Sequence, residues 1–433
     1  MLHVVKRDGR ESRFNADKIA NAIKRAANEV GIAIRESQVL DTIQKVINYI
    51  EMSGKTDVTV EEIQVLVEKA LMDNGFNQVA TAYKAYRTER TKVREIKSDL
   101  MKAISKIGVE TDRDNANVGN NFSSKLLRIA SESNKWYNLA TMPKELAKAH
   151  ENGDVYYHDL DSYNLTTNCL HIPTGELLQS GFNTGYGTIK APRRIETAAE
   201  LSCILLQSTQ NDMFGGQSHP DFDNDMSVFV EPTRQEIREE YIGLGLEGAK
   251  LDELVEKKLR ERVHQAMQGV VYNLNTMHSR AGSQVPFSSL NLGIPYNEDA
   301  ALVCEIFLLE YEKGLGRGEQ PIFPNIIFRV KEGVNREAED PYFYLYELAC
   351  RVAAKRMNPT FMNIDADFNK EYYDKGYMPA TMGCRTYLMK NVNGEPGCKG
   401  RGNIAPTTIN LPRLGILAVS YTHLRAHETE ADL

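Results

Sequence analysis

The segment 381–385, Thr-Met-Gly-Cys-Arg, is a short apolar lead that ends in one cysteine, Cys384. Glycine adopts backbone angles that residues with a Cβ avoid, so Gly383 allows the next residue to be presented at the tip of a tight loop. A thiol in that position can act as a nucleophile, as a redox partner or as a carrier of a hydrogen atom. The alternative is a small side chain in the core, because free cysteines are among the most buried residues.

The six cysteines of the chain are spread widely, and none belongs to a Cys-x-x-Cys pair. This spacing argues against a zinc knuckle and against the disulfide framework of a small secreted protein, and it favours a reducing cytoplasm. Cys169 lies in a segment rich in β-branched and aromatic residues and is the second thiol of chemical interest. We expect Cys203 to belong to the core, and Cys304 and Cys350 to be inert positions within helices.

Two histidines on either side of Cys169 are candidates for acid–base chemistry, namely His158 and His171. No motif surrounds them, and a single histidine is more often structural than catalytic. A structural role is therefore the alternative for each of them.

Three aspartates alternate along the chain at positions 221, 223 and 225. Such an alternation resembles a metal-binding loop, but a calcium-binding hand also has a glycine in its middle and a glutamate at its end, and both are missing. We therefore expect an acidic face in contact with solvent and no metal site. The preceding segment 214–220 contains two glycines and a proline, and we expect it to form a flexible turn.

Cationic side chains concentrate at the beginning of the sequence, as Lys6, Arg7, Arg10, Arg13 and Lys18. Residues 4–7 are predicted to form a strand, Asp8-Gly9 a hairpin turn, and residues 12–14 the returning strand. Asn15 can cap the helix that follows, so the cations would surround a helix N-terminus, which suits a polyphosphate. A basic hairpin in contact with solvent is the alternative.

Apolar residues at helical spacing predict four helices before residue 95. The first ends at Gly31, the second begins at Ser37, and Thr59-x-x-Glu62 forms a capping box for the third. The fourth runs from about Asn77 into the basic stretch 87–94. We place a domain boundary at about residue 95.

Helices and strands alternate beyond this boundary. Predicted helices begin at residue 123 and cover about 144–152, 196–213, 236–275 with a break near Gly243, 301–313 and 342–357. Predicted strands cover 321–330 and 359–364. Alternation of this kind is typical of an α/β fold.

The composition is that of a soluble globular protein, since 42% of the 433 residues are hydrophobic and 26% are charged. The length predicts two or three domains. The net charge of -7 argues against a general nucleic-acid surface, so phosphate binding must rely on local basic groups. We find no apolar run that could span a bilayer and no signal peptide, so we expect a cytoplasmic protein without membrane partners.

Residues 4–10, Val-Val-Lys-Arg-Asp-Gly-Arg, and 14–19, Phe-Asn-Ala-Asp-Lys-Ile, resemble the ATP-cone, the regulatory nucleotide module of ribonucleotide reductases. The resemblance covers about residues 3–92. It implies that ATP or dATP binds as an allosteric effector near Lys6, Arg7, Arg13, Phe14, Asn15 and Lys18. Transcriptional repressors also carry this module, so a non-catalytic nucleotide-binding regulator is the alternative function.

Three longer motifs resemble the anaerobic, class III ribonucleoside-triphosphate reductases. They are His278-Ser-Arg-Ala-Gly-Ser-Gln-Val-Pro-Phe-Ser-Ser-Leu-Asn291, Met382-Gly-Cys-Arg385 and the segment 400–415. The match runs from about residue 1 to 416. It implies an α/β protein with an ATP-cone in residues 1–95, built of a helical bundle and a small sheet. An incomplete ten-stranded α/β barrel with a central finger loop would follow in residues 96–416.

The chemistry of this family, removal of the ribose 2′-hydroxyl, implies roles for four residues. A thiyl radical takes a hydrogen atom from C3′ reversibly, because the S–H and C–H bonds are of similar strength, and by motif this thiyl is on Cys384. Cys169 matches the second active-site cysteine, a hydrogen donor on the 2′ side, and Asn403 matches the asparagine that holds substrate or formate. Met382 fits the subgroup that uses formate as reductant, with a thioredoxin-type partner as the alternative.

The resemblance also implies partners: nucleoside-triphosphate substrates, dNTP effectors, formate, a radical-SAM iron–sulfur activating enzyme and a second copy of the chain in a homodimer. The family stores its radical on a glycine that follows a four-cysteine zinc site, and neither motif follows Cys398 here. Residues 417–433 do not resemble the family, so we expect a non-native tail and no reductase activity of this chain alone. A glycyl-radical enzyme of the formate-lyase type is a further alternative, but those enzymes lack the cone and usually carry two adjacent cysteines at the finger tip.

Overall fold

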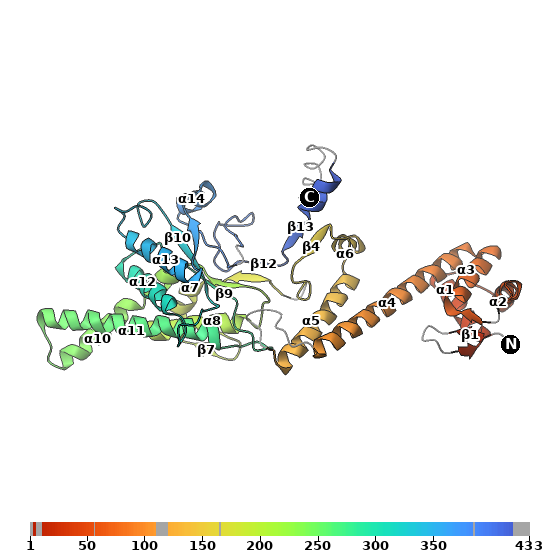
Figure 1. Ribbon diagram of the computed structural model, residues 1–433, viewed down its shortest axis with the longest axis horizontal. Coiled ribbons are helices and arrows are strands. Elements are labelled where there is room, and N and C mark those ends of the chain that lie inside the picture. The colour runs from red at the N-terminus through yellow and green to blue at the C-terminus, as the bar shows by residue number, and fades with distance from the viewer. Residues whose placement is uncertain are drawn as a thin grey trace. The chain divides into compact units, whose positions relative to one another are not determined.

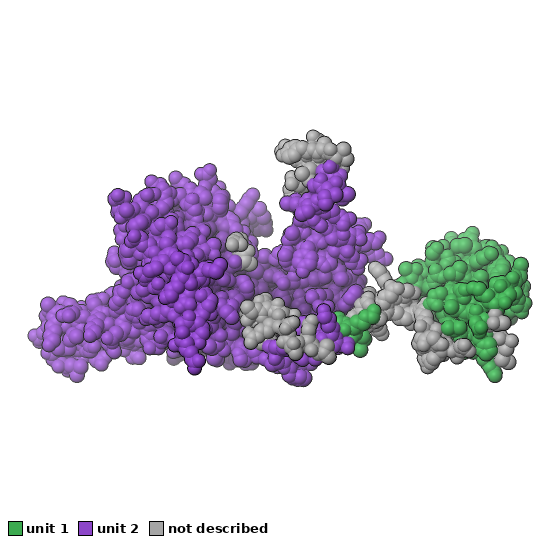
Figure 2. Space-filling model, in the orientation of Figure 1, with its two compact units in different colours: residues 1–103 green, residues 104–433 purple. Residues whose placement is uncertain are grey.

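The computed structural model describes residues 3–5, 11–55, 57–109, 120–163, 166–383 and 386–418 (Figure 1). The chain forms two compact units, residues 1–103 and 104–433, which Figure 2 shows in different colours. Each unit has a hydrophobic core of its own. The division between the units and the boundary predicted near residue 95 both fall within helix α4 (Asn77–Val109).

The first unit combines helices with a small sheet of three strands. β1 (His3–Val5) pairs antiparallel with β2 (Glu11–Arg13) and parallel with β3 (Asp57–Thr59). The helices are α1 (Ala16–Glu29), α2 (Glu36–Met52), α3 (Val60–Asp73) and the start of α4. The predicted hairpin strands and helices are confirmed, while the predicted turn at residues 8–9 lies outside the described residues.

Local hydrogen bonds determine where two of these helices begin. Asn15 Oδ1 accepts a hydrogen bond from the N–H of Lys18 at 3.2 Å, as expected for the cap of α1. At the start of α3, Thr59 Oγ1 accepts from the N–H of Glu62, and the Glu62 carboxylate accepts from the N–H of Thr59. This reciprocal pair is the capping box predicted from the sequence.

The second unit is built on a six-stranded sheet with the order β11-β10-β9-β8-β5-β12. These strands are β5 (Cys169–His171), β8 (Gln217–His219), β9 (Ser288–Leu292), β10 (Asn325–Val330), β11 (Thr360–Asn363) and β12 (Gly402–Asn403). Neighbouring strands are parallel except for β12, which runs antiparallel to β5. Six strands in the described residues fit the predicted incomplete barrel.

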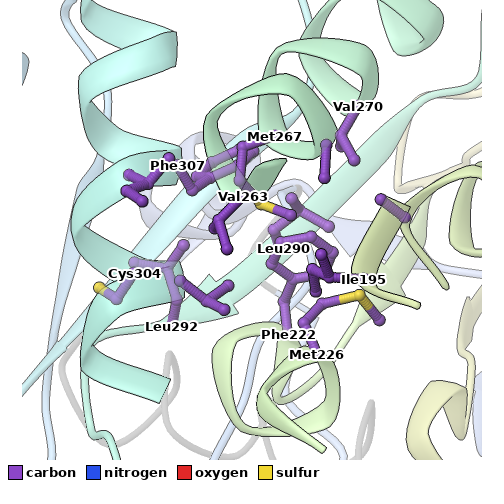
Figure 3. Packing of buried hydrophobic residues seen from close by; sticks show 14 of the residues in the cluster. Ile195, Phe222, Met226, Val263, Met267, Val270, Leu290, Leu292, Cys304 and Phe307 are labelled. Carbon is purple, nitrogen blue, oxygen red and sulfur yellow. The ribbon is translucent and has the colours of Figure 1, made fainter. Parts of the chain in front are cut away.

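Helices cover one face of this sheet. The main ones are α8 (Ile195–Thr209), α11 (Gly248–Thr276), α12 (Glu298–Lys313) and α13 (Phe343–Arg356), with the short α9 (Phe222–Ser227) against β9. Leu290 and Leu292 of β9 lie among Val263 and Met267 of α11 and Phe307 of α12 (Figure 3). Burial of these apolar side chains is the main stabilising term for the unit.

The second unit contains further elements outside this layer. They are α5 (Phe122–Thr141), α6 (Lys144–Glu151), β4 (Val155–Tyr157), α7 (Thr174–Ser180), β6 (Phe182–Asn183), β7 (Thr188–Ile189), α10 (Val230–Gly243), α14 (Asp367–Tyr373), β13 (Thr407–Ile409) and α15 (Leu411–Leu417). β13 pairs antiparallel with β4, and β6 with β7.

Two predictions about residues 214–225 were wrong. The segment expected to be a flexible turn contains the buried strand β8. The aspartates at 221, 223 and 225, expected to face solvent, are only 4%, 0% and 7% exposed. For Asp221 and Asp223 the reason is Arg329, which is fully buried on β10 and whose Nη2 lies 2.6 Å from Asp221 Oδ1 and 3.3 Å from Asp223 Oδ1, while the cation nearest Asp225 is Lys399, with Nζ 3.9 Å from Oδ1. A buried cation requires such counter-charges.

Candidate active site

Cys169 lies on β5, where β12 brings a distant segment of the chain against it. The antiparallel register pairs Cys169 with Asn403 and Leu170 with Gly402. The N–H of Cys169 donates to Asn403 Oδ1 at 2.8 Å. A Cβ on Gly402 would collide with the carbonyl oxygen of Cys169, so glycine permits this close approach. Two of the predicted site residues, Cys169 and Asn403, are therefore adjacent.

The two faces of the sheet differ in polarity, as β9 shows most clearly. Side chains along a strand alternate between faces. Leu290 and Leu292 point into the helical layer (Figure 3), so Ser289 and Asn291 point to the opposite face. That opposite face is polar at its centre.

The strand register places Cys169 on this same polar face. Ser218 of β8 is paired with Ser289, and His171 of β5 is paired with Ser218. Cys169 precedes His171 by two residues and therefore shares its face. Leu170, between them, packs against the helical core on the other side.

The segment that leads to Cys384 is bound to the polar face. The N–H of Thr381 donates to Asn291 Oδ1 at 3.0 Å, and Asn291 Nδ2 donates to the carbonyl of Thr381 at 2.9 Å. The N–H of Gly383 donates to Ser289 Oγ at 2.6 Å. An isolated bridge pairs Thr381 with Tyr387, so the chain reverses between them. The sheet that carries Cys169 thus also holds the approach to Cys384.

Gly383 has a different role from the one predicted. It is not among the glycines with positive φ, so conformational freedom is not what this position requires. A Cβ there would lie 2.5 Å from Asn325 Nδ2 and 2.8 Å from Ser289 Oγ. Glycine is needed because the loop approaches β9 and β10 closely.

Three of the four predicted catalytic residues are described. Cys169 is 4% exposed, Met382 is fully buried, and Asn403 is half-buried. Cys384 lies outside the described residues, so its separation from Cys169 stays a prediction. The anchoring residues Ser289 and Asn291 were missed as individual residues, although both lie in the motif 278–291 that carried the resemblance.

His171 is fully buried on the polar face, and neither ring nitrogen has a hydrogen-bond partner in the described part of the chain. Burial, helped by the nearby Arg401 guanidinium, lowers the pKa of His171 to about 4. The imidazole is therefore neutral at pH 7. His158 Nε2 lies 2.6 Å from Thr408 Oγ1, a contact that joins the end of β4 to β13.

Four of the six predicted effector residues are described, while Lys6 and Arg7 lie outside the described residues. Arg13 and Lys18 are exposed around the N-terminus of α1. Phe14 packs against the core of the first unit, and Asn15 caps the helix. Exposed cations beside a helix N-terminus fit a polyphosphate ligand.

Across the described residues, no group of three or more His, Cys, Asp or Glu side chains is placed to hold a metal ion. Nor does any described helix combine the length and apolar character needed to cross a membrane.

Models of two protein families match the chain. The model for anaerobic ribonucleoside-triphosphate reductase matches residues 114–429, and the model for the ATP cone domain matches residues 2–92. The first match runs past residue 416, where the sequence resemblance was expected to end.

Curated relatives are similar along almost the whole chain. The anaerobic ribonucleoside-triphosphate reductase of Escherichia coli (strain K12) is 29% identical over 430 residues, which cover 96% of this chain and 59% of the relative. The protein of the same name from Haemophilus influenzae is 30% identical over 429 residues, covering 95% and 59%. The chain thus spans about 59% of the length of these relatives.

Among solved structures, a crystal structure of the anaerobic ribonucleotide reductase from Thermotoga maritima in complex with dATP and CTP is similar with a TM-score of 0.49. Its sequence is 18% identical, and the similarity covers 75% of this chain and 57% of that one.

Proposed function

This chain belongs to the anaerobic ribonucleoside-triphosphate reductase family and carries an ATP-cone, and we propose that the protein reduces ribonucleoside triphosphates to deoxyribonucleoside triphosphates by thiyl-radical chemistry. One observation carries the proposal beyond the family. The pair Cys169–Asn403 and the segment that leads to Cys384 lie on the same polar face of one sheet. Residues from these two segments must act on neighbouring carbons of a single ribose.

The proposed reaction begins at C3′ of the ribose. A thiyl radical on Cys384 forms an S–H bond as the C3′–H bond breaks, which leaves the unpaired electron on C3′. Cys169 supplies the proton with which the 2′-hydroxyl leaves as water. Formate is oxidised to carbon dioxide, and its hydrogen and two electrons form the C2′–H bond that replaces the broken C2′–O bond, which again leaves the unpaired electron on C3′. Cys384 then returns its hydrogen atom to C3′ and becomes the thiyl again, while a proton from solvent restores the thiol of Cys169.

Asn403 and Met382 would orient the small reactants. Asn403 Oδ1 is engaged by the N–H of Cys169, which leaves its amide N–H groups as donors for formate or a substrate oxygen. Met382 is fully buried beside the loop tip and provides an apolar wall. Exclusion of water protects a radical and strengthens polar contacts within the site.

The first unit would bind ATP or dATP as allosteric effector. The exposed side chains of Arg13 and Lys18 are suited to the phosphates, and Phe14 and Asn15 lie between them in sequence. Lys6 and Arg7, which lie outside the described residues, complete the proposed set. Binding at this unit would set the activity of the catalytic unit by shifting its population of states.

The proposal includes further partners by analogy with the family. They are a glycyl radical generated by a radical-SAM iron–sulfur enzyme, a structural zinc, dNTPs at a specificity site, and a second subunit in a homodimer. A cytoplasmic location fits this chemistry. A stored glycyl radical would supply the oxidising equivalent that makes the thiyl.

The test uses a protein of the relatives' full length that contains this sequence. It is activated under strict anaerobiosis and given a ribonucleoside triphosphate and carbon-labelled formate. We expect dNTP and labelled carbon dioxide in equal amounts, and dATP to change the rate. Product formed with a dithiol but without carbon dioxide would contradict formate as reductant. Effector binding without any dNTP would contradict the reductase and favour a nucleotide-binding regulator.

A further inference from the structure

Every polar group of Asn168, the residue before Cys169, makes a hydrogen bond. It is 3% exposed. Its N–H donates to the carbonyl of Asn403 at 2.8 Å, and its own carbonyl accepts from the N–H of Gly215 at 2.5 Å. In its side chain, Nδ2 donates to Asp159 Oδ2 at 2.6 Å and Oδ1 accepts from the thiol of Cys169 at 3.3 Å.

The carboxylate of Asp159 determines which way the amide of Asn168 points. An ionised carboxylate only accepts hydrogen bonds, so the NH₂ group of the amide must face it. The amide oxygen is then left facing Sγ of Cys169. Since an amide oxygen cannot donate, the hydrogen bond at the sulfur requires a protonated thiol whose S–H points towards Asn168.

Two glycines, Gly215 and Gly402, pack so closely against Asn168 and Cys169 that a Cβ would not fit at either position. A Cβ on Gly215 would collide with both the carbonyl oxygen and Oδ1 of Asn168. A Cβ on Gly402 would collide with the carbonyl oxygen of Cys169. The backbone around the thiol is thus enclosed by the segment just before β8 and by β12, and the amide has no room to rotate freely.

Asp159 itself is held in an uncommon backbone conformation. Its φ is +50°, in the left-handed region that few residues other than glycine adopt. Its carbonyl accepts hydrogen bonds from the N–H of Ser162 at 2.9 Å and from Ser162 Oγ at 3.0 Å. The turn 159–162 therefore presents the carboxylate to Asn168 in a fixed direction.

We propose that Asn168 is a positioning residue that keeps the thiol of Cys169 protonated and directed, and that Asp159 acts through it by orienting its amide. This inference rests on the proposed function, in which Cys169 must give up a proton. A thiolate at this position would have nothing to donate. An acceptor beside the sulfur favours the S–H form, because only that form makes the hydrogen bond.

The first experiment measures the S–H stretching band of Cys169 by Raman spectroscopy in the 433-residue chain. The band is assigned as the one missing from a Cys169→Ser variant. We expect it at lower wavenumber than a thiol without a hydrogen bond, and at higher wavenumber in Asn168→Ala. Asp159→Asn keeps the shape of the side chain and provides the same test if Asn168→Ala does not fold. It should also raise the wavenumber, because the amide of Asn168 then loses its fixed direction.

A matched control is Asn369→Ala. Asn369 is as buried as Asn168, at 1% exposed, but its amide donates to the carbonyl of Asn363. It should leave the Cys169 band in place. An unchanged band in both Asn168→Ala and Asp159→Asn, or an equal shift in the control, would overturn the proposal.

The second experiment measures turnover by a protein of the relatives' full length. Loss of one hydrogen bond to the thiol should lower kcat about tenfold in Asn168→Ala, with KM for the ribonucleoside triphosphate unchanged. A distorted site would raise KM as well, and kcat is calculated per folded molecule so that partial unfolding does not lower it. If the Raman band shifts but no variant or wild-type protein makes dNTP, the positioning stands and the proposed reaction fails. If the protein turns over and the band does not shift, only the positioning fails.

Discussion

The side-chain oxygen of Asn403 accepts a hydrogen bond from the backbone N–H of Cys169 at 2.8 Å, across 234 residues of sequence. Its backbone carbonyl accepts a second one from the N–H of Asn168. β12 has only two residues, and backbone hydrogen bonds between His171 and residues 400–401 attach the segment before it to β5 as well. The side chain of Asn403 therefore adds one hydrogen bond to an edge strand that the backbone also holds.

We expect Asn403→Ala to lower the free energy of unfolding by about 1–3 kcal/mol, because the N–H of Cys169 is left without its acceptor. Asn403→Asp keeps an oxygen at the same place and should recover most of the loss. Urea unfolding of the two variants measures the difference. An alanine variant as stable as wild type would show that the bond contributes nothing.

Substitution of Gly383 should affect the loop that carries Cys384 more than the stability of the chain. In Gly383→Ala the new methyl group would meet Asn325 Nδ2 and Ser289 Oγ, so the loop must move away from the sheet. We expect a cost of about 1–3 kcal/mol and loss of turnover in a full-length protein. Gly316→Ala is the control, since nothing lies within 4 Å of its added Cβ. Equal turnover in both variants would contradict close approach as the role of Gly383.

Arg329→Leu should be strongly destabilising. It would leave Asp221 and Asp223 buried without their cation, and breaking a buried ion pair in this way costs about 3–5 kcal/mol. The matched control is Arg351→Leu, whose guanidinium forms an exposed bidentate pair with Glu312. An exposed pair contributes less than about 1 kcal/mol. Thermal unfolding distinguishes the two, and equal midpoints would contradict the counter-charge role.

Asp225 should make stability depend on pH. Burial raises its pKa to about 7, although Lys399 lowers it and Asp221 and Asp223 raise it further. Between about pH 4 and pH 7 the folded chain keeps this proton and the unfolded chain releases it, so the stabilisation present at pH 4 is lost as the pH rises to 7. Asp225→Asn should lack this loss, which is on the order of 3 kcal/mol.

The measurement is the difference in unfolding free energy between wild type and Asp225→Asn across that range. His171 and His219, each with a pKa lowered to about 4 mainly by burial, have the opposite slope, but they cancel in the difference. A constant difference from pH 4 to pH 7 would contradict a buried, protonated Asp225.

Features that depend on neighbouring residues were predictable from the sequence. Asn15 and the pair Thr59–Glu62 mark the starts of α1 and α3 through bonds that span three residues. Helical spacing of apolar residues predicted α1 and α2, because this pattern also relates residues three or four positions apart. Longer motifs in the correct order indicated the family, since chance agreement over several segments is improbable.

Features that depend on distant partners were not predictable. The aspartates at 221 and 223 look solvated in the sequence, and they are buried because Arg329 lies opposite them in the fold. Ser289 and Asn291 bind the segment 381–383 from about ninety residues away. Nothing in the sequence around Asn168 indicates that Asp159 orients its amide or that the thiol of Cys169 donates to it. Patterns of neighbouring residues in the sequence do not indicate contacts of this kind.

Cys384 and Cys169 should act together on one ribose. We would measure dNTP formation by full-length, anaerobically activated protein with Cys384→Ser, Cys169→Ser and, as control, Cys350→Ser, which replaces an exposed thiol on α13. We expect the first two variants to make no detectable dNTP and the control to match wild type. Turnover that persists in Cys384→Ser would contradict the claim.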